Sequence, residues 1–142
     1  MIRVKKFSSI TMSQLRKKQK FLEITLKELE ESGAPIMVEG KRDKEALERI
    51  GVKNRIFLIN MTPDKLSKRI SKVADKAVIL TDFDETGEKL CKRVEEALYS
   101  YNVLPNTEVR RKLRHLLGVY NFEEIDRRME EFKKKIEGDL NG

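Results

Sequence analysis

Short apolar runs that alternate with amphipathic stretches constrain the fold of this chain most strongly. The runs lie within the expected strands 36–38, 55–59 and 77–81. The first shows no polar alternation, which indicates a strand that is buried on both faces. Strands that alternate with helices pair in parallel, because each helix carries the chain back across the sheet. The sequence therefore predicts an α/β fold of three layers, with a parallel sheet of about four strands in the middle and its fourth strand near 102–105.

Amphipathic helices are predicted between these strands and at both ends of the chain. Apolar residues recur at helical spacing from about 13 to 32, 43 to 50, 63 to 74 and 90 to 101, and twice more in the tail. A chain of 142 residues is long enough for one core and too short for two full domains. We expect a basic N-terminal segment with a helix at 1–32, a core domain at 33–105 and a helical C-terminal extension at 106–142.

The net charge of +7 is concentrated near the N-terminus. Residues 1–22 contain seven basic residues and no acidic one, whereas the rest of the chain carries 24 of each sign. The seven are Arg3, Lys5, Lys6, Arg16, Lys17, Lys18 and Lys20. A polyanion is one partner that such a segment would bind, and a solvated helix face is the alternative interpretation.

The sequence contains no candidate for a membrane span or a zinc site. Its longest apolar runs are four residues long, against about 20 for a helix that crosses a bilayer. The chain shows no signal-peptide core, and the lone Cys91 cannot form a disulfide within it. One cysteine and one histidine are too few for a zinc site. We therefore expect a cytoplasmic protein without a membrane partner.

Carboxylates directly follow two of the apolar runs. Glu39 comes after the first run, and Asp82 and Asp84 come after the third. Because parallel strands end at the same edge of a sheet, these side chains are expected to converge where α/β sheets bind ligands. Carboxylates that repel one another favour a hard cation, and Mg²⁺ prefers oxygen ligands. Gly40 and Gly87 would leave room beside the acids for a phosphate, which the following helix N-terminus could bind.

Two segments of the chain resemble the two motifs of the Toprim domain: VEGKRD at 38–43 and TDFDETGEK at 81–89. This domain is shared by topoisomerases, bacterial primases, certain nucleases and small stand-alone proteins. The likeness is closest to the stand-alone proteins and to the Toprim part of the ribonuclease that matures 5S ribosomal RNA, where Gly-Glu-Lys likewise follows the acid pair. The resemblance extends over residues 35–105.

The resemblance implies a Rossmann-like Toprim fold and Mg²⁺-dependent phosphodiester chemistry of the nuclease or nucleotidyl-transfer type. Asp82 and Asp84 would be ligands of one or two Mg²⁺ ions, and Glu39 would be a further ligand or a general acid/base. The substrate would be RNA or DNA, in RNA processing or DNA repair. Because the tyrosine-bearing domain of topoisomerases and the zinc region of primases are missing, we expect a protein partner that supplies a further domain.

Several basic residues are candidates for contacts with nucleic acid. Three of them lie in the loops that carry the acids and could neutralise phosphate. The others lie in amphipathic helices outside the two motifs, where a solvated helix face is the alternative. The candidates are Lys41, Arg42 and Lys89 in the loops, and Arg16, Lys17, Lys18, Arg110 and Arg111 in the helices.

Two alternative functions remain open on the sequence. A Toprim fold could hold nucleic acid without cleaving it, through the basic residues of its helices. The segment 78–86 also fits the Asp-x-Asp-x-Thr motif of haloacid-dehalogenase phosphatases, in which Asp82 would be the nucleophile. That motif normally opens its domain, however, and it leaves the carboxylate at Glu39 unexplained.

Overall fold

A computed structural model describes residues 10–141 of the chain. Its sheet has four strands, all parallel, in the order β2-β1-β3-β4. They are β1 (Ile36–Val38), β2 (Ile56–Leu58), β3 (Lys76–Ile79) and β4 (Leu104–Asn106). The predicted α/β fold with a four-stranded parallel sheet is confirmed. Residues 1–9, with Arg3, Lys5 and Lys6 of the basic segment, lie outside the described range.

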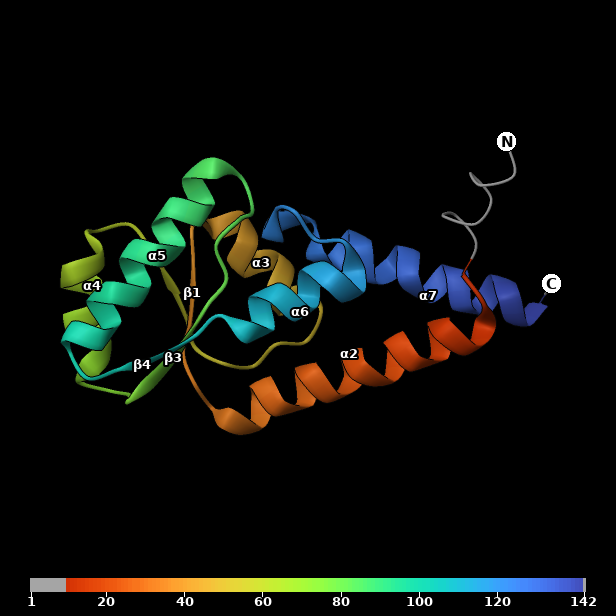
Figure 1. Cartoon of the computed structure of the whole chain (residues 1–142), viewed down its shortest axis with the longest axis horizontal. Coiled ribbons are helices and arrows are strands. Elements are labelled where there is room, and N and C mark those ends of the chain that lie inside the picture. Colours follow the sequence, from red (N-terminus) through yellow and green to blue (C-terminus); the bar gives the residue numbers. More distant parts are fainter. Residues whose placement is uncertain (1–9, 142) are drawn as a thin grey trace.

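Helices cover both faces of the sheet (Figure 1). They are α2 (Met12–Ser32), α3 (Lys41–Arg49), α4 (Pro63–Ser71), α5 (Glu85–Ser100), α6 (Glu108–Leu117) and α7 (Ile125–Asn141), with a 3₁₀ turn, η1 (Phe122–Glu124), before the last. Among the residues that the structure describes, none of these helices combines the length and the apolar character that a membrane crossing requires.

Alternate residues of the strands face two separate cores. Met37 and Ile79 pack in one core with residues of α4 and α5. Ile36, Val38 and Val78 pack in the other core with residues of α2, α3 and α6. Because successive side chains of a strand point to opposite faces, both cores are built from the same short runs. This arrangement produces the three layers and explains why the runs are apolar throughout.

Local signals begin and end the helices near the strands. The hydroxyl of Thr62 accepts a hydrogen bond from the N–H of Lys65 over 3.2 Å, and Pro63 is the first residue of α4, as predicted. Helix α2 is followed by Gly33, whose φ of 63° lies in the left-handed region that favours glycine. The chain therefore leaves α2 sharply and enters β1 within a few residues.

The C-terminal part of the chain belongs to the same core as the strands. The side chains of Leu113, Phe122 and Ile125 have no exposed surface and pack in one cluster with Ile36 and Val38. The turn η1 also packs against α3, which directly follows β1. The segment after β4 therefore closes the core and also reaches the edge of the sheet where the acids lie.

We predict that Phe122→Ala lowers the free energy of unfolding by about 3–5 kcal/mol, because it leaves a cavity in a fully buried site. Urea unfolding followed by circular dichroism measures the change. Phe21→Ala is the matched control: this ring is 60% exposed, so the same truncation should cost less than about 0.5 kcal/mol. Equal losses in the two variants would contradict the packing described.

Candidate active site

The two acid clusters meet at the carboxyl edge of the sheet. Glu39 follows β1 directly, and Asp82 lies just beyond the end of the neighbouring strand β3. The carboxylate of Glu39 accepts a hydrogen bond from the backbone N–H of Asp82, with an N···Oε2 distance of 2.7 Å. This bond connects the two motifs beyond the point where the backbone pairing of β1 with β3 ends.

Asp82 and Asp84 also accept hydrogen bonds from backbone N–H groups. Asp82 Oδ1 accepts one from Phe122 over 2.8 Å, and Asp84 Oδ1 accepts one from Gly87 over 2.7 Å. The second of these bonds makes Asp84 the N-cap of α5. For Glu39, Asp82 and Asp84, no hydrogen bond within the described residues engages the second carboxylate oxygen. Each acid therefore has one oxygen committed to the fold and one available to a ligand.

A fourth carboxylate, Asp43, lies beside these three and was not singled out from the sequence. Its Oδ2 accepts a hydrogen bond from the N–H of Gly40 over 3.0 Å, and the residue is only 6% exposed. Burial raises the pKa of Asp43, and the nearby charges of Glu39 and Glu123 add to this effect. An acid three residues after Gly40, at a helix start, has the spacing of a capping carboxylate, which is the signal that could have identified it.

The negative charge of each carboxylate makes ionisation of its neighbours less favourable. Burial raises the pKa of Asp82 to about 6, the hydrogen bond from Phe122 opposes this shift, and the charges of Asp43, Glu39 and Asp84 add to it. The site thus concentrates negative charge in a half-buried place. A cation there would relieve the repulsion and bring the pKa of Asp82 down again.

The donor atoms at this edge fit Mg²⁺ in their chemistry, since all of them are carboxylate oxygens. In residues 10–141, no three His, Cys, Asp or Glu side chains are grouped so that they could hold a metal ion. The carboxylates of Glu39, Asp82 and Asp84 are instead turned toward backbone N–H groups. Ligation by all three would require their free oxygens to turn toward a common point.

Arg110 of α6 binds the backbone of the loop that carries the second motif. Its Nε donates to the carbonyl of Thr81 and its Nη2 to the carbonyl of Asp82, each over 2.7 Å, and it forms an ion pair with Glu88. Its guanidinium also lies 4.0 Å from the centre of the Phe83 ring. The sequence suggested Arg110 as a nucleic-acid contact, but it is 8% exposed and its donors are used inside the protein. Arg110 therefore positions the acid loop.

The other predicted cations lie in different places. Lys41 and Arg42 are exposed in the first turn of α3, beside the acids. Lys89 is exposed on α5 and pairs with Glu85 over 3.0 Å. The remaining candidates lie away from the acid loop on two other helices, α2 and α6, with Arg111 paired to Glu108. They are Arg16, Lys17, Lys18 and Arg111.

The two glycines that were expected to admit a phosphate differ in their surroundings. A Cβ on Gly87 would lie 2.1 Å from the backbone carbonyl oxygen of Asp82. Gly87 also accepts, through its own carbonyl, a hydrogen bond of 2.9 Å from Thr81. A Cβ on Gly40, in contrast, would meet only the Asp43 carboxylate at 4.0 Å. Close backbone packing therefore accounts for Gly87, whereas Gly40 has space beside it.

We predict that Gly87→Ala lowers the free energy of unfolding by about 1–3 kcal/mol, since the start of α5 must move away from Asp82. Gly40→Ala is the matched control and should change this free energy by less than about 0.5 kcal/mol. Urea unfolding of both variants decides the comparison. A Gly87→Ala protein as stable as Gly40→Ala would refute the packing argument.

We predict that Asp82→Asn stabilises the metal-free protein at neutral pH. The folded-state pKa of Asp82, about 6, lies above the ordinary value of 3.8, so the wild type loses stability as the pH rises through this interval. After allowance for partial exposure, the variant should be about 1–2 kcal/mol more stable near pH 7.5, with the difference vanishing below about pH 4. Denaturant unfolding in EDTA across this pH range measures it.

Asp126→Asn is the control with the opposite sign. A hydrogen bond from Arg49 lowers the pKa of Asp126, so its charge stabilises the folded state at neutral pH and this contribution disappears as the pH falls. The Asp126 variant should therefore be less stable than the wild type at neutral pH. If Asp82→Asn behaved in the same way, the repulsion described at the acid site would be disproved.

Comparison with known proteins agrees with this arrangement. Residues 34–116 match the family model of the Toprim domain. The UPF0292 protein MJ1624 of Methanocaldococcus jannaschii is 35% identical over 105 residues, which cover 72% of this chain and 79% of that protein. The UPF0292 protein PF1724 of Pyrococcus furiosus is 36% identical over 98 residues, which cover 69% and 73% of the two chains.

A solved structure of a protein from Aquifex aeolicus has a similar fold. It is 30% identical, superposes with a TM-score of 0.64, and the match covers 72% of this chain and 96% of that one. Toprim domains act on or bind nucleic acid, typically with Mg²⁺. The family match, the parallel sheet and the acids at its carboxyl edge lead to the same conclusion: the chain belongs to the Toprim domain family and to the UPF0292 proteins.

Proposed function

We propose that this protein catalyses Mg²⁺-dependent phosphodiester chemistry on nucleic acid, of the nuclease or nucleotidyl-transfer type. The observation that carries the proposal is the hydrogen bond from the Asp82 N–H to the Glu39 carboxylate, which brings the two Toprim motifs together. The raised pKa of Asp82 supports it, because burial and the charges of Asp43, Glu39 and Asp84 disfavour its ionised form, which a bound cation would stabilise.

In this proposal Asp82 and Asp84 bind one or two Mg²⁺ ions through the oxygens that the fold leaves available. The chemistry supplied with Mg²⁺ bound is polarisation of the phosphodiester and stabilisation of the departing oxygen. Glu39 serves as a further ligand or moves the proton of the attacking group. Lys41 and Arg42, exposed in the first turn of α3, would hold the phosphate next to these acids.

A nucleic-acid-binding module without cleavage is the second candidate. The observation that favours it is that the three carboxylates are turned to backbone N–H groups and, among residues 10–141, are not grouped around a common point. The phosphatase alternative finds less support, because the family match is to the Toprim domain and Glu39 takes part in the same site as Asp82.

We predict that structured RNA or nicked DNA is processed in the presence of Mg²⁺ or Mn²⁺, with cleavage of a phosphodiester by water. Glu39→Gln and Asp82→Asn should each reduce the rate by at least roughly 100-fold, as measured with end-labelled substrates on denaturing gels. Asp75→Asn is the matched control, because Asp75 is an exposed acid at the opposite end of β3. An activity that both site variants retain would refute the proposal.

A thermal-unfolding measurement separates the two candidates independently of turnover. The wild type should be stabilised by added Mg²⁺, and Asp82→Asn and Asp84→Asn should lose this stabilisation while Asp75→Asn keeps it. A binding module predicts no metal-dependent shift, together with nucleic-acid affinity that Asp84→Asn leaves intact or improves.

A further inference from the structure

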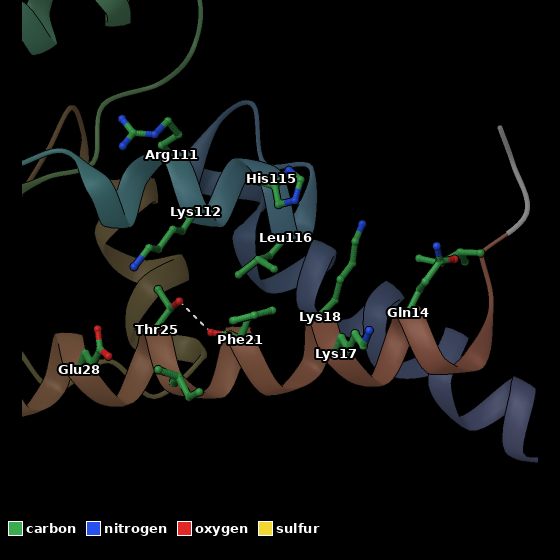
Figure 2. Close-up of a pocket in the computed structure, with 12 residues that line it drawn as sticks. Gln14, Lys17, Lys18, Phe21, Thr25, Glu28, Arg111, Lys112, His115 and Leu116 are labelled. Atoms are coloured by element: carbon green, nitrogen blue, oxygen red, sulfur yellow. Dashed lines mark hydrogen bonds between the residues drawn. The ribbon is translucent and has the colours of Figure 1, made fainter.

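A groove between α2 and α6 lies outside the acid site (Figure 2). Its volume is about 1040 Å³. Lys18 rises from α2 and Lys112 descends from α6, so that both side chains reach into the space between the two helices (Figure 2). The proposed phosphodiester chemistry assigns no role to this groove.

The groove joins two basic parts of the sequence that are far apart along the chain. Lys17 and Lys18 come from α2, and Arg111, Lys112 and His115 come from α6. Lys17, Lys18 and Lys112 form no ion pair with any described acid, and Arg111 pairs with Glu108 outside the groove. Glu28 is the acid among the lining residues. The groove therefore carries a surplus of positive charge that an anionic occupant would neutralise.

The floor of the groove is apolar and unusually exposed. Phe21 is 60% exposed and Ile24 is 41% exposed, whereas Leu22 on the same helix is only 5% exposed. Leu116 of α6 continues this floor between the cations. An aromatic ring that is open to solvent among lysines provides both elements of a surface for single-stranded nucleic acid: a platform for base stacking and charges for the phosphates.

The alternatives fit this combination less well. A duplex would offer phosphates to the lysines, but its bases are stacked inside and leave the Phe21 ring without a partner. An acidic protein segment would also match the charges. Two observations favour nucleic acid over an acidic protein segment. Residues 34–116 match the Toprim domain, and residues 1–22 contain seven basic residues and no acidic one.

We propose that the groove between α2 and α6 binds a single-stranded segment of nucleic acid, with its phosphates on Lys17, Lys18 and Lys112 and a base on the ring of Phe21. This inference rests on the proposed function in that it names the class of nucleic acid that the protein takes. It concerns binding at a place other than the acids, so the two can fail separately.

The test is the affinity for fluorescently labelled oligothymidylate of about 12 nucleotides, measured by anisotropy in EDTA at several salt concentrations. Replacing Lys17, Lys18 and Lys112 together by Gln should weaken binding about tenfold or more and reduce the salt slope by about 2. The matched control carries the same three changes at Lys65, Lys68 and Lys72, which are exposed on and next to α4 on the other face of the sheet. Equal weakening in the control would overturn the proposal.

Phe21 variants test the stacking contact. Phe21→Ala and Phe21→Leu should both weaken binding by about 5- to 100-fold with the salt slope unchanged, and Phe21→Tyr should retain the wild-type affinity. Wild-type affinity in Phe21→Leu would overturn the assignment of a base to this ring. Tighter binding of a duplex of equal length, or equal competition by polyglutamate, would overturn the choice of single-stranded nucleic acid.

A last variant separates this inference from the proposed function. Glu39→Gln should keep the wild-type affinity in EDTA whether or not it abolishes turnover, because the groove does not include the acids. Tighter binding by Glu39→Gln would place the strand at the carboxyl edge, where loss of this negative charge removes a repulsion from the phosphates, and would overturn the groove as its binding site.

Discussion

The hydrogen bond between the N–H of Asp82 and the carboxylate of Glu39 connects the fold to its proposed chemistry. It lies between the ends of β1 and β3, which are neighbours only because the chain crosses over the sheet between them. Parallel pairing places both strand ends at one edge, and this bond then sets how closely the two acid motifs approach. The first turn of α3 follows Glu39 and the N-terminus of α5 follows Asp84, so both helix starts lie at this edge of the sheet.

Holding carboxylates so close requires support from elsewhere in the chain. The N–H of Phe122 binds Asp82 from the turn before α7, and Arg110 binds the carbonyls of Thr81 and Asp82 from α6. These contacts come from the tail, which buries Phe122 in the same core as the strands. The hydrogen bond from Phe122 opposes the rise in the pKa of Asp82, but burial and the neighbouring acids still keep this pKa raised. The fold thus keeps a charged site in place at a cost to its own stability.

The sheet and three of the acids could be predicted because the residues that indicate them lie next to one another in the sequence. Two of the three apolar runs are followed at once by a carboxylate, and Thr62 with Pro63 marks a helix start within two residues. The hydrogen bonds that support the site could not be predicted in this way, because the two partners Asp82 and Phe122 are separated by 40 residues in the sequence. Arg110 illustrates the difficulty: it sits next to the buried Val109, and only the packed structure shows that its guanidinium faces inward. The groove likewise depends on the approach of two helices that are distant in sequence.

Helix α6 contributes to both places at once. Arg110 near its start holds the acid loop, while Lys112 and Leu116 line the groove against α2. A helix of 10 residues is about 15 Å long and behaves as a rigid rod. It therefore sets a fixed distance between the groove that would bind a nucleic-acid strand and the edge of the sheet where a phosphodiester of that strand would react. In such an arrangement the length of strand between the two points is determined by the protein, so that chain length, rather than base sequence, would select the phosphodiester presented to the acids.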